Sequence, residues 1–121
     1  MAGYRQRLGS RGEQLTADWY LARGYRVVAR NWRCREGEID LVLEGESDLV
    51  FCEVKTRTSH RFGLPAEAVT PAKQRRLRVL AVRYLAEQGG GRAGRDAGRR
   101  SIRFDVAAVS GGRVEVIEAA F

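Results

Sequence analysis

Two apolar segments joined by a short polar stretch constrain the fold of this chain more than any other feature. Residues 37–44 read Gly-Glu-Ile-Asp-Leu-Val-Leu-Glu, and residues 49–57 read Leu-Val-Phe-Cys-Glu-Val-Lys-Thr-Arg. The four residues between them, 45–48, are a common length for a hairpin loop. The sequence therefore predicts an antiparallel hairpin, each strand of which carries acids among apolar residues although acids are depleted in strands.

The predicted register sets two of these acids against each other. Side chains alternate between the two faces of a strand, so Asp40 shares a face with Val42, and Glu53 shares a face with Phe51. A four-residue loop pairs Val42 with Phe51 and Asp40 with Glu53. Opposed carboxylates whose Cβ atoms lie ~5 Å apart repel by about 3 kcal/mol at an effective dielectric constant near 20. Something must offset this repulsion.

Three arrangements would offset it: a proton shared by Asp40 and Glu53, a nearby cation such as Lys55, or a divalent metal ion. Mg²⁺ (or Mn²⁺) suits the pair because it binds through one or two carboxylates and keeps several waters for a substrate phosphate. In the non-functional alternative, both acids point to water and Lys55 pairs with Glu38. Apolar neighbours on the same face favour a functional site, because a half-covered acidic pair beside a lysine has shifted pKa values.

The rest of the chain divides into two helices, three further strands and two long loops. We expect a helix over 10–23 that begins at a capping box, Ser10-Arg-Gly-Glu13, and a second helix that opens at Thr70-Pro71. The further strands are expected at 25–32, 102–109 and 114–119, an irregular loop at 58–69 and a flexible Gly/Arg-rich loop at 89–100. The order is αβββαββ, which predicts an α/β domain: a mixed sheet, with an antiparallel meander of the first three strands, flanked by helices.

Composition narrows the class of protein. A chain of 121 residues is large enough for one domain, 1–121, without disulfides or structural zinc. We find no apolar segment of the ~20 residues that span a bilayer and no signal peptide. The two cysteines, Cys34 and Cys52, are interpreted as reduced thiols. We therefore expect a cytoplasmic protein with no membrane partner. Its net charge is +7, and 20 of its 22 basic residues are Arg. The positive charge favours a polyanion as partner, namely nucleic acid, whereas the excess of Arg over Lys is explained equally well by an Arg-rich genome composition.

Several other polar residues are candidates for a site. At the start of the second helix, the dipole favours phosphate, and the residues there are either contacts to a nucleic-acid backbone or a solvated face. The candidate contacts are Lys73, Gln74, Arg75 and Arg76, together with Arg57 after the hairpin. Glu13 is explained equally well as the third residue of the capping box or as a catalytic acid. Asp105, between Phe104 and Val106, is expected to be a hydrogen-bonded structural acid.

Five sequence elements resemble the YraN-like family of small bacterial proteins. They are Arg11-Gly-Glu13, Asn31-Trp-Arg-Cys-Arg35, Gly37-Glu-Ile-Asp-Leu-Val42, Phe51-Cys-Glu-Val-Lys-Thr-Arg57 and Arg103-Phe-Asp-Val106. That family is regarded as a nuclease group, similar to the archaeal Holliday-junction resolvases and to the restriction-endonuclease-like PD-(D/E)xK superfamily. The resemblance covers the chain from about residue 7 to residue 117 and implies a restriction-endonuclease-like fold.

The resemblance also implies roles for single residues. It makes Asp40 and Glu53 metal ligands with the backbone carbonyl of Val54 as a third, and Lys55 the residue that orients the attacking water and stabilises charge on the phosphate. Glu13 matches the additional acid of the resolvases. Ile39 stands where the superfamily's motif has a proline. Resolvases cut two strands with two active sites, so the resemblance further suggests a homodimer.

The function that these observations favour is a Mg²⁺-dependent nuclease that hydrolyses DNA phosphodiesters, including branched DNA. Two alternatives have the same fold and basic surface. One is a catalytically silent nucleic-acid-binding module, and the other is an adaptor that recruits a DNA-processing partner through the Gly/Arg-rich loop.

Overall fold

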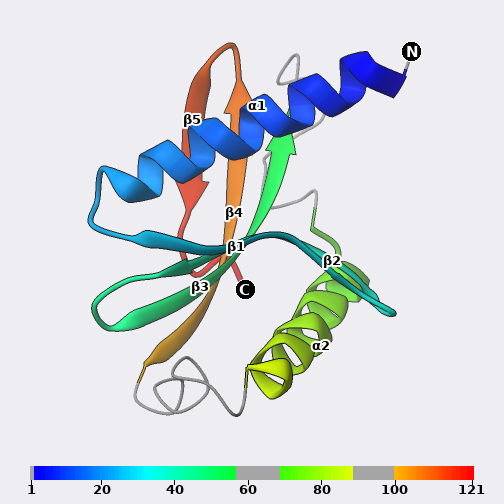
Figure 1. Cartoon of the computed structure of the whole chain (residues 1–121), viewed down its shortest axis with the longest axis vertical. Coiled ribbons are helices and arrows are strands. Elements are labelled where there is room, and N and C mark those ends of the chain that lie inside the picture. The colour runs from blue at the N-terminus through cyan, green and yellow to red at the C-terminus, as the bar shows by residue number, and fades with distance from the viewer. Residues whose placement is uncertain (1, 57–68, 89–99) are drawn as a thin grey trace.

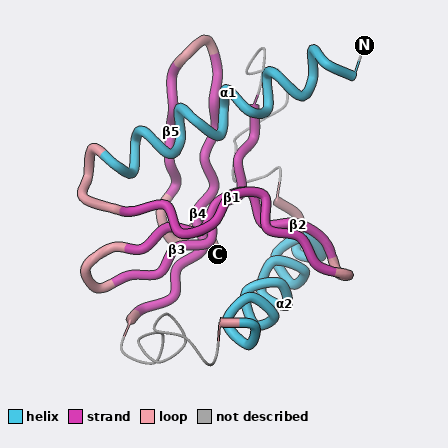
Figure 2. Tube along the Cα trace, viewed as in Figure 1, coloured by secondary structure: helices cyan, strands magenta, loops and turns pink. Residues whose placement is uncertain are grey.

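Seven elements follow one another along the chain in the predicted αβββαββ order (Figures 1 and 2). The structure is a computed structural model that describes residues 2–56, 69–88 and 100–121. The elements are α1 (Ala2–Leu21), β1 (Arg26–Cys34), β2 (Gly37–Glu44), β3 (Asp48–Thr56), α2 (Pro71–Glu87), β4 (Ser101–Ser110) and β5 (Arg113–Ile117). The irregular loop expected at 58–69 and the Gly/Arg-rich loop expected at 89–100 lie almost wholly outside the described residues.

The five strands form one mixed sheet in the order β1-β2-β3-β4-β5. The predicted meander is confirmed, because β1, β2 and β3 pair antiparallel. β3 and β4 pair in parallel, and β5 returns antiparallel to β4. Parallel neighbours need a crossover connection, and α2 lies in that connection between β3 and β4. The strand that carries Glu53 and Lys55 is therefore the central strand.

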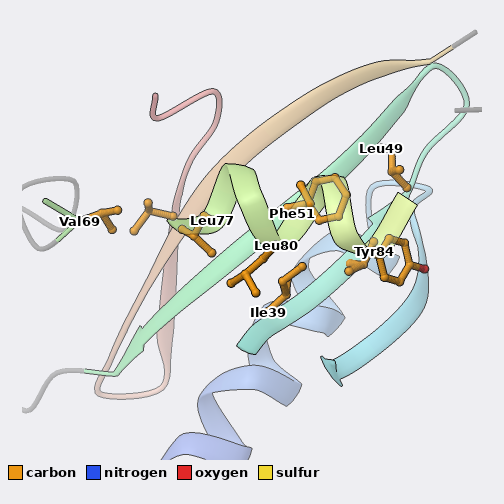
Figure 3. Close-up of a cluster of buried hydrophobic side chains, with 10 residues drawn as sticks. Ile39, Leu49, Phe51, Val69, Leu77, Leu80 and Tyr84 are labelled. Atoms are coloured by element: carbon orange, nitrogen blue, oxygen red, sulfur yellow. The ribbon is translucent and has the colours of Figure 1, made fainter. Parts of the chain in front are cut away.

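Apolar side chains on the two faces of the sheet form two separate cores. Val42 and Phe51 pack with Leu77, Leu80 and Tyr84 of α2 on one face, and Figure 3 shows the α2 side chains against Ile39 and Phe51. On the other face, a cluster from the neighbouring strand positions packs with α1; it consists of Leu41, Leu43, Val50, Cys52 and Ala107 with Ala17 and Tyr20. The strict alternation of β3 thus places Glu53, two residues after Phe51, on the face that α2 covers.

The β2–β3 ladder is shorter than the sequence predicted. The pairs from Glu44–Leu49 to Leu41–Cys52 follow the predicted register, but the ladder ends there, so the expected pairing of Asp40 with Glu53 is wrong. In Figure 1, the β1–β2 hairpin turns toward α2, whereas β3 continues under α1. The side-chain alternation also breaks at this point, because Ile39 packs in the same cluster as Val42 instead of with Leu41.

An irregular backbone in β1 accompanies this break. Asn31, which lies between the β1 residues that pair with Leu41 and Ile39, has a φ of 49°. A non-glycine residue in the left-handed region is uncommon, and Asn tolerates it better than most. A register shift between Val27 and Ala29 lies earlier in the same strand. Such irregularities bend a strand and re-aim its side chains.

Helix α1 begins eight residues before the predicted start. It runs from Ala2, so Ser10 lies inside the helix and the predicted capping box is wrong. The Gly of Arg11-Gly-Glu13 has a packing role: a Cβ at Gly12 would lie 2.3 Å from Oγ1 of Thr56 at the end of β3. Gly12 therefore allows α1 to approach β3 closely.

The predicted start of α2 and the predicted role of Asp105 are both confirmed. Thr70 caps α2, because its hydroxyl accepts the N–H of Lys73, and Pro71 occupies the first turn. Asp105 is fully buried, and its carboxylate accepts hydrogen bonds from the hydroxyl of Tyr20 at 2.5 Å and from two nitrogens of Arg103 at 2.9 Å each. Buried charges persist when they are paired and hydrogen-bonded in this way.

Candidate functional site

Asp40 lies at the opening between β2 and β3. Its Oδ2 accepts the backbone N–H of Val54 at 2.8 Å, two residues beyond the last β2–β3 pair. The carboxylate thus takes the place of strand-to-strand pairing at the point where the two strands part. This bond fixes one oxygen of Asp40 against β3 and brings the carboxyl group beside Glu53.

Glu53 forms an ion pair with the lysine two residues later on the same strand face. Its Oε1 lies 3.2 Å from Nζ of Lys55, and both side chains are about one-fifth exposed. The cation that the sequence offered as one way to offset the acidic pair is therefore present. The pairing of Lys55 with Glu38 that the non-functional alternative assumed is wrong, because Glu38 accepts from Arg33 of the neighbouring strand at 3.2 Å.

Electrostatics single out Asp40 among these acids. Burial, together with repulsion from Glu53, raises the pKa of Asp40 to about 7, although the N–H of Val54 opposes the shift. Glu13 and Glu38 add smaller repulsive contributions. A carboxyl group held against ionisation by burial and by neighbouring acids is a frequent property of functional sites. It also marks a place where a positive charge would be stabilised.

A shallow cleft of about 100 Å³ opens beside Glu53 on the α2 face of the sheet. Its polar lining comes from Glu38, Glu53, Lys73 and Arg76, and its apolar lining includes Leu77 and Leu80. Gly37 forms part of the wall, where a Cβ would lie 3.5 Å from Cδ of Arg76. The cleft joins the acidic end of β3 to the first turns of α2.

The predicted nucleic-acid contacts of α2 separate into two groups. Lys73 and Arg76 line the cleft beside Glu53, and repulsion from Lys55 lowers the pKa of Lys73. Gln74 instead donates from its amide to the carbonyl of Val69 at 3.1 Å, and Arg75 is exposed and does not line the cleft. Arg57 lies outside the described residues.

Glu13 approaches the same acids from the α1 face. Its Oε2 accepts from Nδ2 of Asn31 at 3.0 Å, and its charge contributes to the raised pKa of Asp40. The cap that could have explained Glu13 without chemistry is absent, since the helix starts earlier. Sequence reasoning missed Asn31, which donates to Glu13 and lies at the irregular part of β1. An Asn inside a predicted strand was the sequence signal that could have indicated this irregularity.

Hard oxygen donors are present at this site, but no complete metal cage is. Within residues 2–56, 69–88 and 100–121, no three His, Cys, Asp or Glu side chains are grouped so that they could hold a metal ion. A Mg²⁺ ion does not require such a cage, because it binds through one or two carboxylates and keeps several waters. Asp40 and Glu53 meet that requirement in donor type.

None of the helices in the described part of the chain is long and apolar enough to cross a membrane.

Comparison with known proteins identifies the family. The pattern of the uncharacterised protein family UPF0102 matches residues 12–109, a range that contains Asp40, Glu53 and Lys55. A UPF0102 protein of Mycolicibacterium vanbaalenii is 49% identical over 114 residues, which cover 94% of this chain and 88% of the relative. One from Acidothermus cellulolyticus is 43% identical over 128 residues and covers 99% and 97% of the two chains. One from Symbiobacterium thermophilum is 56% identical over 84 residues, or 69% and 71% of the two chains. The chain therefore belongs to UPF0102, the YraN-like family that its motifs resemble.

Proposed function

We propose that this protein is a metal-dependent nuclease that hydrolyses DNA phosphodiesters at the opening between β2 and β3. The observation that carries the proposal is the position of Asp40, a carboxyl group with a pKa raised to about 7, beside the ion pair of Glu53 and Lys55. Two acids and a lysine, next to a cleft that Lys73 and Arg76 help to line, are the groups that phosphodiester hydrolysis uses.

Asp40 and Glu53 would hold Mg²⁺ or Mn²⁺, with the backbone carbonyl of Val54 as a third ligand. The chemistry of the donors fits, because both carboxylates offer hard oxygens and one oxygen of Asp40 is already fixed by Val54. A cation would offset the burial and the repulsion from Glu53 that raise the pKa of Asp40. When bound, such an ion polarises the phosphodiester and lowers the pKa of water.

The side chains around the ion have separate tasks in the proposed reaction. Lys55 orients the attacking water and offsets the negative charge that grows on the phosphate, for which its three N–H donors are suited. Attack on phosphorus proceeds in line with the departing ester oxygen. Glu13, held by Asn31, adds negative charge on the α1 side and serves as the additional acid. The acids thus lie on both faces of the opened sheet.

Lys73 and Arg76 would hold the nucleic-acid backbone over the cleft. Both line it, and the N-terminal turn of α2 adds a favourable dipole for phosphate. Arg75 extends this basic surface. The net charge of +7 attracts the polyanion over a longer range. Salt should therefore weaken binding steeply, since each neutralised phosphate releases counterions.

The fold supports this proposal by analogy. A mixed five-stranded sheet between two helices, with an Asp-x₁₂-Glu-x-Lys pattern on consecutive central strands, resembles the restriction-endonuclease-like superfamily. Fold analogy alone does not transfer activity. Because one site cuts one strand, cleavage of branched or duplex DNA would require a homodimer, which sedimentation of the protein with and without DNA would reveal.

A catalytically silent nucleic-acid-binding module is the second candidate. It is favoured by the lack of a three-acid metal cage among the described residues and by the ion pair that already neutralises Glu53. Such a module would bind DNA with the same salt dependence but would not bind Mg²⁺ at Asp40.

Cleavage assays separate these candidates. Fluorescently labelled branched, single-stranded and duplex DNA would be incubated with wild type, Asp40→Ala and Lys55→Ala, each with Mg²⁺, Mn²⁺ or EDTA. We expect metal-dependent cleavage by wild type and at least a 100-fold loss in each variant, in line with the several kcal/mol that such groups supply. Equal cleavage by wild type and Asp40→Ala, or none by any protein while DNA still binds, would reject the nuclease.

A further inference from the structure

Lysine is scarce in this chain, and the fold brings its only two lysines together. Of 22 basic residues, Lys55 and Lys73 alone are lysines; the other 20 are arginines. They lie on different elements, β3 and α2. Both lie at Glu53: Lys55 pairs with its carboxylate at 3.2 Å, and Lys73 lines the same cleft as Glu53. Repulsion from Lys55 is also the largest cause of the lowered pKa of Lys73. Nothing in the sequence order alone places them side by side.

Two neighbouring ammonium groups need negative charge to hold them together. The acid that acts on both is Glu53, which pairs with Lys55 at 3.2 Å and raises the pKa of Lys73 by its charge. One carboxylate neutralises only one of two ammonium groups. The cleft that Glu53 and Lys73 line is the open side from which a further anion can reach the pair.

The chemistry of lysine explains why two of them suit one anion. An ammonium is a compact point charge with three rotatable donors, whereas a guanidinium is a planar fork that itself occupies two oxygens of a phosphate. Two ammonium groups can therefore approach different oxygens of the same tetrahedral phosphate. Arg76, which lines the cleft one turn further along α2, would then reach the neighbouring phosphate of the chain.

We propose that Lys55 and Lys73 bind one and the same phosphate group of the nucleic acid, Lys55 from the central strand and Lys73 from α2. This inference rests on the proposed function, since it takes that phosphate to be the one presented to Asp40 and Glu53. Lys73 would then contact the reacting phosphate itself instead of another part of the nucleic-acid backbone. We call this pair of residues, Lys55 and Lys73, the lysine clamp. Because the clamp needs both β3 and α2, neither lysine alone retains the affinity for the phosphate.

Selective labelling tests this clamp without any cleavage. Protein grown with ¹³C,¹⁵N-lysine contains two labelled side chains, so each lysine gives its own Cε–Hε signal in an NMR spectrum. A thymidine dinucleotide with a 5′ phosphate would be titrated in EDTA, with thymidine as the uncharged control ligand. We expect both signals to shift with a single dissociation constant and neither to respond to thymidine.

Variants decide whether the two lysines act together. Lys73→Gln should weaken the response of the Lys55 signal at least tenfold. Arg113→Gln, which removes the same charge from the exposed first residue of β5, should change it less than twofold. Two different dissociation constants, an unchanged response in Lys73→Gln, or an equal loss in Arg113→Gln would overturn the clamp.

The outcome is separable from that of the proposed function. A protein that fails to cleave DNA but shows the coupled lysine response keeps the clamp and loses the nuclease. A protein that cleaves DNA while Lys73→Gln leaves both the lysine response and cleavage unchanged keeps the nuclease and loses the clamp.

Discussion

Replacing Asp40 by Asn tests the electrostatic account of the site through the stability of the protein. The amide oxygen of Asn can still accept the N–H of Val54, which donates to Asp40 at 2.8 Å, but the side chain can no longer ionise. The change therefore removes the charge and retains the hydrogen bond. Asp18→Asn, the same change at an exposed position of α1, is the matched control.

The sign and size of the effect follow from the pKa of Asp40. The pKa is 3.8 for an unperturbed Asp and about 7 in the folded protein. Between these values the folded state holds a proton that the unfolded state has released, so the stability of wild type falls as pH rises from about 4 to 7. The difference of about three pKa units corresponds to about 4 kcal/mol at 1.36 kcal/mol per unit. Partial exposure of Asp40 and relaxation around it make this a ceiling.

Urea unfolding from pH 4 to pH 8.5 measures the effect. We expect the free energy of unfolding of Asp40→Asn, minus that of wild type, to rise by about 1–4 kcal/mol between pH 4 and pH 7.5 and then level off. Asp18→Asn should show no comparable rise. Saturating Mg²⁺ at pH 8 should stabilise wild type by about 2–3 kcal/mol at one hundred times its Kd and leave Asp40→Asn unchanged. A difference curve that is flat with pH would refute the reasoning.

Two further predictions concern the packing that holds the site. Gly12→Ala should destabilise the protein by about 1–2 kcal/mol in thermal unfolding, because overpacking at Oγ1 of Thr56 exceeds the gain in helix propensity. Adding Thr56→Ala should restore the lost stability. Simple additivity of the two changes would contradict a direct clash. Asp105→Ala should lower the free energy of unfolding in urea by about 3–5 kcal/mol, because it leaves the partly buried Arg103 without its bidentate partner. Tyr20→Phe, which removes one neutral donor to Asp105, should lower it by about 1 kcal/mol. Equal losses in the two variants would contradict this ranking.

Local signals were sufficient to predict most of the fold. The hairpin register from Glu44–Leu49 to Leu41–Cys52 follows from the length of the loop and the period of two. The start of α2 follows from Thr70 and Pro71, whose capping chemistry is local. The start of α1 could not be predicted from a local signal, because Ser10 resembles a cap but lies inside a helix that continues toward the N-terminus. A residue that suits a cap also occurs within helices, so such a signal sets a boundary only where the helix truly ends.

The candidate site depends on events that lie outside any local pattern. The predicted pairing of Asp40 with Glu53 assumed that the β2–β3 ladder extends beyond the pair of Leu41 with Cys52. In the structure, β3 stays paired with β4 as far as Thr56, whereas the part of β2 before Leu41 is not paired with β3. Loop length and side-chain alternation do not specify where two paired strands separate. The acids still come together, although through a bond from Asp40 to the backbone instead of a strand pair. The position of Lys73 beside Glu53 likewise depends on the placement of α2.

The most direct test of the central claim is a crystal structure of the protein soaked in Mn²⁺, with data collected at the manganese absorption edge. We predict an anomalous peak between the carboxylates of Asp40 and Glu53, within bonding distance of both, and displacement of Lys55 from Oε1 of Glu53. A crystal of Asp40→Asn under the same conditions should show no peak there. Absence of the peak in wild type at a Mn²⁺ concentration that supports cleavage, with the pair of Glu53 and Lys55 intact, would contradict the assignment of this opening as the metal-dependent active site.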